Sequence, residues 1–378
     1  MSAEIERHAA LIIGAGPAGL SIGARLADRG VDVLVLEGTE VIGSSWRTRY
    51  DELRLNTDRL MARQPGWFVP PGRWPTRDDF VAYLEAFRER HRIPVRFGTT
   101  VQRIERREPD WLLHTDGGML ASRFLIIATG RDRLPRMPRW AGIEEFQGEL
   151  LHASEYRRVT PFVGRDVLIV GIGNSGTEIA TQLALGGARR VRVATRTPPN
   201  LVPANLLGIP ITLWARVAAH MPSWIVDPFG RWIQRAFVGD LSAHGLGQAP
   251  MGIATELKCK GLGPVIDRGF TAAVRAGSIE LVAALERFDA HAVCLGDDSR
   301  IDPEVVIAAT GYRYGLEDLV GHLSILTPSG EPAVRDGRCH PAAPGLFFHG
   351  YWLELTGELA AMRHNARRIA AAILDVRN

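Results

Sequence analysis

The sequence predicts an α/β fold in which two parallel sheets each carry a glycine-rich turn that leads into a helix. Two motifs of the form Gly-x-Gly-x-x-Gly predict it, one beginning at Gly14 and the other at Gly171. Each motif follows a short apolar run and opens a stretch of helical periodicity, which is the strand, turn and helix context of a dinucleotide-binding domain. A chain of 378 residues has room for about two to three domains. We therefore expect two Rossmann-like dinucleotide-binding domains.

The first motif has all the parts that such a domain needs. Gly14 allows a tight turn, Gly16 lets the backbone approach a pyrophosphate, and Gly19 lets the helix pack closely on the strand. The next predicted strand, at residues 31–36, ends at Glu37, whose carboxylate can accept hydrogen bonds from ribose hydroxyls. Together these features predict a bound dinucleotide rather than a glycine-rich turn without a ligand.

The second motif repeats the pattern with one change. Predicted strands at residues 167–170 and 191–194 flank a predicted helix at 177–185. The second of these strands is followed by Arg196 and by no acidic residue. A carboxylate there would repel a 2′-phosphate, whereas a guanidinium group can bind one through paired hydrogen bonds. The second site is therefore predicted to prefer NADPH over NADH, although Arg196 could also be a solvated surface residue.

Composition excludes several classes of protein. A net charge of +3, with 46% hydrophobic and 23% charged residues, indicates a soluble globular chain and no nucleic-acid partner. The three cysteines form no Cys-x-x-Cys pair, which favours a reducing compartment, unpaired and mostly buried thiols, and no metal site. The absence of such a pair also argues against the flavin disulfide reductases, whose chemistry needs two neighbouring redox thiols. No secretory signal or stretch of ~20 apolar residues occurs, so we expect a cytoplasmic protein without a transmembrane segment.

A repeated triplet suggests how the two domains are connected. It follows a predicted strand twice, as Ala128, Thr129 and Gly130 and as Ala309, Thr310 and Gly311. Small residues and a glycine allow the chain to turn closely over a bound nucleotide. We interpret the repeat as the places where the chain leaves one nucleotide domain and returns to it. The first domain would then span residues 1–157 and 291–378, with the second inserted at 158–290.

The inserted domain itself contains an unusual apolar segment at residues 201–262. Its aromatic residues include Trp214, Trp224, Phe229, Trp232 and Phe237. Pro210, Pro222 and Pro228 predict two or three short helices rather than one long helix. The segment could cover a substrate pocket, form a homodimer contact or lie on a membrane surface. Simple packing against the nucleotide domains is expected for most of its aromatic side chains.

A third motif identifies a family resemblance. Phe146, Gly148, His152 and Tyr156 fit the pattern F-x-G-x-x-x-H-x-x-x-(Y/F), and the chain thereby resembles the flavin-containing monooxygenases. Residues 43–46, 50–55, 171–178 and 264–267 resemble motifs of the plant YUCCA-type enzymes in particular. Asn56 and residues 351–357 depart from the plant pattern, and Asn56 looks more like the asparagine near the flavin of other flavin-containing monooxygenases. A tyrosine at position 156, rather than a tryptophan or an aspartate, makes assignment to the Baeyer–Villiger enzymes less favoured.

The resemblance implies FAD in the first domain and NADPH in the second. NADPH would reduce the flavin, O2 would give a C4a-(hydro)peroxyflavin, and one oxygen atom would enter a small organic substrate. That substrate could be a nitrogen or sulfur compound, or an aromatic 2-oxo acid such as indole-3-pyruvate that loses carbon dioxide. An NADPH oxidase, a redox-sensing flavoprotein and a Baeyer–Villiger-type monooxygenase are the alternatives.

The motifs and the resemblance together give candidate site residues. Asn56 is the candidate catalytic residue near the flavin and nicotinamide, although it could equally be a turn residue. For FAD the candidates are Gly14, Gly16, Pro17, Ala18, Gly19, Glu37, Gly38, Ser45, Trp46, Arg47, Val101, Ala128, Thr129, Gly130 and Leu359. For NADPH they are Gly171, Gly173, Asn174, Ser175, Gly176, Glu178, Arg196, Ala309, Thr310 and Gly311. A C-terminal helix beginning near Thr356 could hold the negative charge of a reduced flavin, and His152 is expected to be a buried structural residue.

Overall fold

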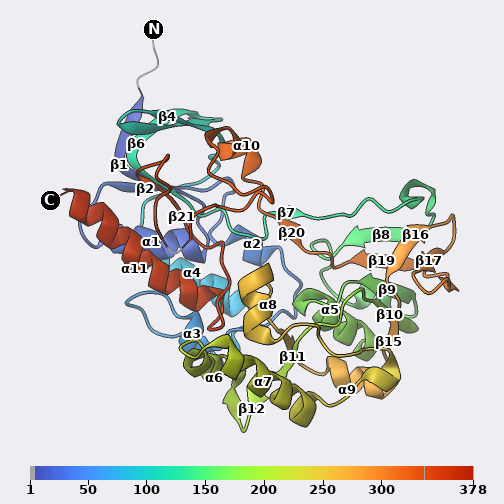
Figure 1. The fold of residues 1–378 in the computed structure, drawn as a ribbon. Coiled ribbons are helices and arrows are strands. Elements are labelled where there is room, and N and C mark those ends of the chain that lie inside the picture. The colour runs from blue at the N-terminus through green and yellow to red at the C-terminus, as the bar shows by residue number, and fades with distance from the viewer. Residues whose placement is uncertain (1–4, 336, 378) are drawn as a thin grey trace. The chain divides into compact units, whose positions relative to one another are not determined.

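The computed structural model describes residues 5–335 and 337–377 and divides the chain into two compact units (Figure 1). Unit 1 consists of Met1–Thr48, Leu53–Leu134 and Tyr312–Asn378, and unit 2 consists of Arg49–Glu52 and Pro135–Gly311. The chain leaves unit 1 within β7 (Leu134–Pro135) and returns at β20 (Tyr312–Arg313). Unit 2 is therefore inserted into unit 1, and both units are α/β, which confirms the predicted fold class.

Unit 1 is built on a seven-stranded mixed sheet with the order β3-β2-β1-β6-β5-β4, and β21 pairs with β6 outside this path. Its strands are β1 (Glu6–Ile13), β2 (Val33–Leu36), β3 (Val95–Arg96), β4 (Val101–Arg107), β5 (Asp110–Thr115), β6 (Gly118–Ile127) and β21 (Leu346–Phe348). The register sets Ile13 of β1 beside both Leu36 of β2 and Ile127 of β6. These three parallel strands therefore end together, at the edge where such sheets bind nucleotides.

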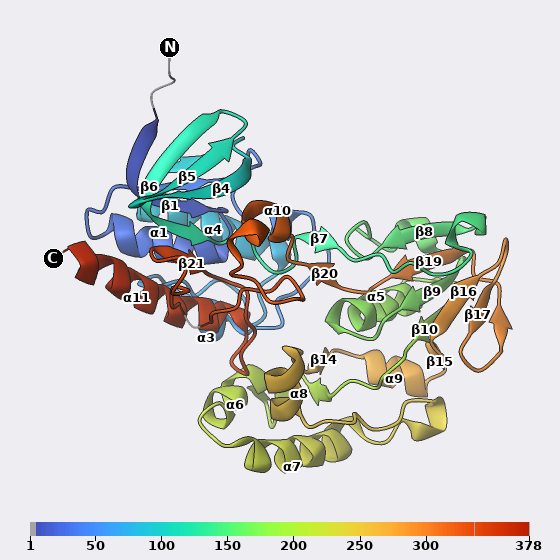
Figure 2. The same ribbon diagram turned by 45° about the horizontal axis from the view of Figure 1, so that its top comes forward.

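Three long helices complete unit 1, with short helices between them. They are α1 (Pro17–Ala27), α4 (Arg77–Arg90) and α11 (Glu358–Arg377), and the short ones are α2 (Ser44–Arg47), α3 (Arg59–Ala62) and α10 (Glu317–Val320). Figures 1 and 2 show α1 and α11 side by side on one face of the sheet. Leu20 and Ile22 of α1 and Ile369 and Ile373 of α11 are buried in the same apolar cluster. This spacing of buried residues is that of helices with one core-facing stripe.

A buried histidine lies under α1. His349 directly follows β21, and its Nε2 lies 3.0 Å from the Ser21 hydroxyl oxygen. Since Ser21 donates its proton to the Ala18 carbonyl (2.7 Å), the imidazole Nε2–H is the donor to Ser21. Nδ1 of His349 is then an unprotonated acceptor, and it has no recorded hydrogen-bond partner. Burial lowers the pKa of His349 from 6.5 to about 3, so the imidazole is neutral in the folded protein.

We expect this histidine to make the protein sensitive to acid. In the unfolded chain this histidine binds a proton below about pH 6.5, whereas in the folded chain it stays neutral down to about pH 3. The free energy of unfolding therefore decreases as the pH falls through this window, by up to ~1.4 kcal/mol per pH unit. His349→Gln cannot titrate, and its Tm should fall less between pH 7 and pH 4 than that of the wild type. The exposed His322→Gln is the control. An identical pH dependence of Tm in all three proteins would contradict the prediction.

Unit 2 contains a five-stranded sheet with the order β15-β10-β9-β19-β8, in which all pairs are parallel. Its strands are β8 (Glu149–His152), β9 (Asp166–Val170), β10 (Arg190–Ala194), β15 (Glu280–Val282) and β19 (Val305–Ala308). Val170 pairs with both Ala194 and Ala308, so three strands again end together. Helices α5 (Asn174–Leu185) and α9 (Phe270–Arg275) pack beside this sheet, and β16 (Leu285–Phe288), β17 (Val293–Leu295) and β18 (Arg300–Ile301) form a small antiparallel sheet.

The borders of the compact units differ from the borders expected near residues 157 and 291. The reason is that β8 and β19 both belong to the second sheet, where β19 forms a parallel ladder with β9. The segment Arg49–Glu52 also joins unit 2, and the Asp51 N–H donates to the Arg157 carbonyl at 2.9 Å. The assignment of FAD to the first domain and NADPH to the second stays a prediction about these units.

The segment 201–262 forms three α-helices and a small hairpin, and one further strand of it pairs with β14 just beyond the segment. They are α6 (Ile211–Ala218), α7 (Ser223–Ile233), α8 (Ile253–Lys260), the hairpin of β12 (Asn205–Leu206) and β13 (Ile209–Pro210), and the pair of β11 (Leu201–Pro203) with β14 (Val265–Asp267). Pro210 and Pro222 precede α6 and α7 directly, as predicted for helix boundaries. Pro228 instead lies inside α7, which continues past it into a π-helical turn at Gln234–Val238.

The expectation that the aromatic side chains of this segment are packed is wrong for four of them. Trp224 is 74% exposed, Phe229 48%, Trp232 54% and Phe237 44%. Only Trp214 is half-buried, and its indole N–H donates to the Leu206 carbonyl. The physical reason is that α7 carries apolar side chains on two faces, and the interior of unit 2 covers only one of them.

The three cysteines differ in exposure. Cys259 is exposed, whereas Cys294 and Cys339 are half-buried and no disulfide links them, so the thiols are less buried than expected. Among the residues described, no helix is long and apolar enough to cross a membrane.

Candidate cofactor sites

The first glycine-rich turn is shaped by two glycines that permit close packing. Gly14 has φ +105°, and a Cβ atom there would lie 2.6 Å from the Ala128 carbonyl oxygen. A Cβ atom at Gly19 would overlap the Gly14 carbonyl oxygen. Gly16 differs from both, because no atom lies within 4 Å of the position its Cβ would take. Gly14 and Gly19 thus allow the close packing of the turn, whereas Gly16 borders open space in which a ligand could lie.

This open space faces the beginning of α1. Gly16 is the N-cap of the helix with an extended backbone, and no side chain caps the first turn. Pro17 stands at the first helical position, and Ala18 and Gly19 follow it without any acidic neighbour. Uncapped N–H groups and the helix dipole make such an end a binding site for an anion. The turn therefore fits the pyrophosphate of a dinucleotide.

Glu37 lies beside the same turn, directly after β2. Its side chain is only 6% exposed, and its Oε2 accepts the Ala15 N–H at 2.8 Å. Its Oε1 accepts the N–H and the hydroxyl group of Thr39 at 3.1 and 2.8 Å. These bonds hold the carboxylate in one orientation at the end of the parallel strands. Oε2 accepts a single recorded bond and retains a lone pair for a ribose hydroxyl.

The second turn repeats the geometry of the first. Gly171 has φ +116°, and a Cβ atom there would lie 2.5 Å from the Ala309 carbonyl oxygen. A Cβ atom at Gly176 would overlap the Gly171 carbonyl oxygen, whereas one at Gly173 would have no atom within 4 Å. Gly173 is also the N-cap of α5, whose first turn, including Ser175, has no side-chain cap. Unit 2 thus carries a second turn of the same shape.

Each Ala-Thr-Gly triplet belongs to the turn of its own unit. Ala128 contacts the turn at Gly14, and Ala309 contacts the turn at Gly171. The second triplet follows a strand of the second sheet, and the chain returns to unit 1 directly after it, at Tyr312. Gly130 and Gly311 both have positive φ, at +83° and +81°, with open space where a Cβ would be. The Thr129 hydroxyl group pairs with the Tyr351 hydroxyl at 2.7 Å, and the Thr310 hydroxyl donates to the Arg136 carbonyl.

Two polar side chains of the second motif hold neighbouring segments. Asn174 accepts the Ile266 N–H at 2.9 Å, which ties α5 to β14. Glu178 accepts a hydrogen bond from the buried Tyr50 hydroxyl. Burial and the adjacent carboxylate raise the pKa of Tyr50 well above its ordinary value, so Tyr50 remains a donor. Tyr50 belongs to a YUCCA-like motif, but its pairing with Glu178 is not predictable from the sequence, because 128 residues separate the two in the chain.

Arg196 is exposed in the loop directly after β10. Among the residues described, no ion pair or hydrogen bond is recorded for its guanidinium group. β10 lies next to β9, and the Gly171 N–H donates to the Ala194 carbonyl at 3.0 Å. The loop therefore begins beside the second turn, where a 2′-phosphate is expected.

Arg196→Ala should raise the KM for NADPH by about 10–100-fold and leave the KM for NADH nearly unchanged, because a charge-assisted pair contributes about 1.5–3 kcal/mol. The measurement is initial-rate kinetics with each nucleotide. Arg158→Ala, an exposed arginine of the same unit, is the control. Equal effects on both nucleotides would show that Arg196 does not bind the phosphate.

The candidate catalytic residue Asn56 lies in a loop of unit 1 before α3. Its Oδ1 is buried and has no hydrogen-bond partner among the residues that the structure describes. The loop lies against the beginning of α11, since a Cβ atom at Gly357 would be 2.9 Å from the Thr57 hydroxyl oxygen. An unpaired buried acceptor costs about 1–3 kcal/mol. A donor group on a bound molecule would relieve this cost, so the site fits a cofactor with N–H groups.

The beginning of α11 carries opposite charges. Glu358 lies in the first turn of this helix. Burial by itself tends to lower the pKa of Arg131. The attraction of Glu358 and other acidic groups outweighs burial, so the pKa of Arg131 is raised above its ordinary value. Arg131 and Glu358 are therefore neighbours at the helix end that was expected to hold a reduced flavin. Leu359 is buried in the apolar cluster beneath it.

The other FAD candidates have varied surroundings. Trp46 packs edge-on against Phe80 at 4.9 Å, and Arg47 forms an ion pair with Glu85. Val101 is buried in an apolar cluster at the start of β4. Ser45 is exposed on α2, and Gly38 follows Glu37 with the Thr100 hydroxyl 3.3 Å from its missing Cβ. The structure uses Trp46, Arg47 and Val101 in protein contacts, and any cofactor contact of these residues stays a prediction.

His152 is buried and neutral, in agreement with a structural role. The Ser154 N–H donates to its Nδ1 at 3.0 Å, so Nε2 carries the proton and donates to the Gly311 carbonyl at 3.1 Å. Burial lowers the pKa of His152. The imidazole thereby links the end of β8 to the loop that follows β19.

Comparisons with known proteins agree with these two turns. A family model described as flavin-binding monooxygenase-like matches residues 114–323, and one described as pyridine nucleotide-disulphide oxidoreductase matches residues 11–204. The chain is similar to indole-3-pyruvate monooxygenase YUCCA1 of Oryza sativa subsp. japonica, with 32% identity over 87% of this chain and 81% of that protein. The probable indole-3-pyruvate monooxygenase YUCCA9 of Arabidopsis thaliana is 31% identical over 90% and 83%.

Solved structures show the same fold at lower identity. A flavin-containing monooxygenase from Stenotrophomonas maltophilia superposes with a TM-score of 0.72 at 22% identity, covering 97% of this chain and 99% of that one. A cyclohexanone monooxygenase gives a TM-score of 0.72 at 20% identity, covering 99% and 88%. The family model covers more than half of the 378 residues, and the resemblance to YUCCA enzymes extends over most of both chains. The chain therefore belongs to the flavin-binding monooxygenase-like family, as an FAD- and NADPH-dependent flavin monooxygenase.

Proposed function

We propose that the protein oxidatively decarboxylates an aromatic 2-oxo acid of the indole-3-pyruvate type. The observation that carries the proposal is the similarity to indole-3-pyruvate monooxygenases over more than four fifths of both chains. The balanced reaction consumes one 2-oxo acid, one O2, one NADPH and one proton. It releases the carboxylic acid shortened by one carbon, carbon dioxide, water and NADP+.

The residues of this chain would hold the two cofactors. The uncapped beginning of α1, with Gly16 beside it, would bind the FAD pyrophosphate, and Glu37 would bind its ribose. The beginning of α5, with Gly173, would bind the NADPH pyrophosphate, and Arg196 its 2′-phosphate. When bound, the cofactors supply hydride transfer and the activation of O2. The protein orients them and keeps water away.

Asn56 would act on the reacting region itself. Its buried Oδ1 can accept a hydrogen bond from an N–H or O–H group and hold that group in place, while the amide itself stays neutral. The neighbouring beginning of α11 would stabilise negative charge with its N–H groups and with Arg131.

Oxygenation of a nitrogen or sulfur compound is the second candidate. Asn56 favours it, because the residue resembles the asparagine near the flavin in other flavin-containing monooxygenases. Residues 351–357, which depart from the plant pattern, precede α11 and lie in the same region of unit 1.

Substrate-dependent NADPH consumption decides between these candidates. We expect indole-3-pyruvate to accelerate NADPH oxidation about tenfold or more over the rate without substrate, with one indole-3-acetic acid formed per NADPH. Methyl phenyl sulfide, N,N-dimethylaniline and cyclohexanone are the comparison substrates. Acceleration by the sulfide or amine alone would support N- or S-oxygenation, and lactone formation would indicate Baeyer–Villiger chemistry. A rate independent of every compound, with stoichiometric hydrogen peroxide, would indicate an NADPH oxidase.

A further inference from the structure

An exposed apolar area covers α6, α7 and the hairpin before them. We call it the aromatic surface, and it consists of Leu207, Ile209, Val217, Met221, Trp224, Ile225, Phe229, Trp232 and Phe237. These nine residues are among nineteen exposed large apolar side chains in the described part of the chain, although they come from a stretch of only about thirty residues. Figures 1 and 2 both show α6 and α7 side by side at one margin of unit 2. Exposed apolar groups in such density mark a binding surface.

The spacing along α7 shows that this exposure is a property of one helix face. Trp224, Ile225, Phe229 and Trp232 stand one, four and three residues apart and are all exposed. The buried residues Val226, Gly230 and Ile233 fall on the opposite face. The helix therefore has one apolar face that packs inside unit 2 and a second that stays exposed in the described part of the chain. Phe229 and Trp232 stack with ring centroids 5.6 Å apart, and Trp232 meets Phe237 edge-on at 6.1 Å.

The exposed charges around the aromatic surface are mostly positive. Arg216, Arg231 and Arg235 are exposed, and no ion pair of theirs is recorded among the residues described. Two acidic residues lie between residues 207 and 240: Asp227, which is buried and accepts the Ala254 N–H at 2.7 Å, and the exposed Asp240, whose carboxylate interacts with the charge of Arg235. With three exposed arginines against the one carboxylate of Asp240, the surface has a net positive charge, and two copies of it would repel each other in a symmetric dimer. An anionic surface would attract it.

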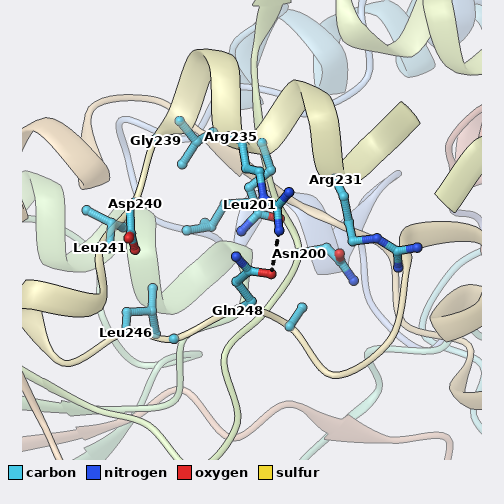
Figure 3. Close-up of a pocket in the computed structure, with 13 residues that line it drawn as sticks. Asn200, Leu201, Arg231, Arg235, Gly239, Asp240, Leu241, Leu246 and Gln248 are labelled. Atoms are coloured by element: carbon cyan, nitrogen blue, oxygen red, sulfur yellow. Dashed lines mark hydrogen bonds between the residues drawn. The ribbon is translucent and has the colours of Figure 1, made fainter. Parts of the chain in front are cut away.

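A cavity lies beside two of these arginines. It has a volume of about 190 Å³ and lies between the end of α7 and the loop at residues 239–249, with Arg231 and Arg235 in its lining (Figure 3). Arg235 reaches the neutral Gln248 amide oxygen at 3.4 Å. The single acidic lining residue, Asp240, accepts the Ser242 N–H at 2.9 Å. Both guanidinium groups thus stand beside open space at the edge of the aromatic surface.

We propose that the aromatic surface binds the interface of a lipid bilayer that contains anionic phospholipids. The aromatic side chains would enter the boundary between headgroups and acyl chains, and the arginines would contact lipid phosphates. Tryptophan, phenylalanine and arginine are the residues that such interfaces favour. With 8 residues in α6 and 11 in α7, these helices are too short to span a bilayer, so they would lie in its plane.

Co-sedimentation with vesicles tests the proposal. The FAD-loaded full-length protein is mixed with phosphatidylcholine vesicles with and without phosphatidylglycerol. We expect binding to the anionic vesicles that weakens with salt. The variant Trp224→Ser/Trp232→Ser should lose about tenfold or more of the partition coefficient per tryptophan. Arg216→Gln/Arg231→Gln/Arg235→Gln should lose about fivefold per arginine on anionic vesicles only.

Matched controls separate the surface from general stickiness. Leu185→Ser removes an apolar side chain that is 80% exposed elsewhere in unit 2, and Arg90→Gln/Arg107→Gln removes two exposed arginines of unit 1. Both should bind vesicles as the wild type does, and flavin absorbance checks that every variant is folded. Absence of vesicle binding by the wild type would overturn the proposal. So would a wild-type dimer in light scattering that the tryptophan variant converts to a monomer, because the surface would then be an interface between two copies.

Discussion

Gly16→Val should yield a folded protein that purifies without FAD. Gly16 has an extended backbone, with φ −83° and ψ −176°, which valine adopts readily. Nothing in the protein lies within 4 Å of its Cβ position, so the substitution strains no contact. The new methyl groups would occupy the space where the backbone must approach the pyrophosphate. Overpacking of this kind costs about 1–3 kcal/mol or more, which raises the Kd for FAD ~10–100-fold.

The measurements are the flavin absorbance of the purified protein and titration of the apoprotein with FAD. Gly173→Val is the matched control, because its Cβ position is equally open and its helix equally uncapped. That variant should keep FAD but be reduced by NADPH only at much higher concentrations. A yellow, fully loaded Gly16→Val protein would refute the assignment of the first turn. Loss of flavin in both variants would mean that the substitutions act through the fold.

Asn56→Ala should divert electrons from product to hydrogen peroxide. Asn56 has a buried amide oxygen that we propose bonds a cofactor or substrate, and losing such a bond costs about 1–3 kcal/mol. We expect kcat/KM for product formation to fall by ~10–100-fold, while FAD content and the KM for NADPH change little. The measurement is the ratio of hydrogen peroxide to NADPH consumed in the presence of substrate.

Two comparisons give this experiment its meaning. Asn205→Ala removes an exposed asparagine of β12 and should leave the ratio unchanged. If Asn56 only shapes a turn, the alanine variant would have a lower Tm and less bound FAD but an unchanged ratio of peroxide to NADPH. That result would remove Asn56 from the list of residues that act on the reaction.

The local elements were predictable because their signals are local. Gly14 and Gly171 each stand between an apolar run and a helical pattern, and both became a turn between a strand and a helix. The order of apolar and polar residues within about ten positions is enough for this. Pro228 shows the limit of local signals, since α7 continues through it. The contacts of the buried face of α7 outweigh the missing hydrogen bond of the proline.

The membership of strands in sheets was less predictable. The triplets after Ile127 and Ala308 look alike in sequence, and the sequence predicts that the strands before both of them belong to the first domain, at residues 1–157 and 291–378. Backbone pairing decides instead that β19 lies beside β9, in the second sheet. Pairing of distant strands depends on long-range contacts that leave no mark in the residues themselves.

The sequence by itself determined the presence of two nucleotide-binding turns, the insertion of one α/β domain into another and the family. These follow from glycines at fixed spacing, where backbone geometry admits few other residues. The tertiary structure alone decided that Tyr50 donates to Glu178, that Asn56 carries an unpaired buried oxygen and that the α7 aromatics face outward. Burial and hydrogen-bond partnership depend on which segments meet in space, and a single sequence does not encode those meetings locally.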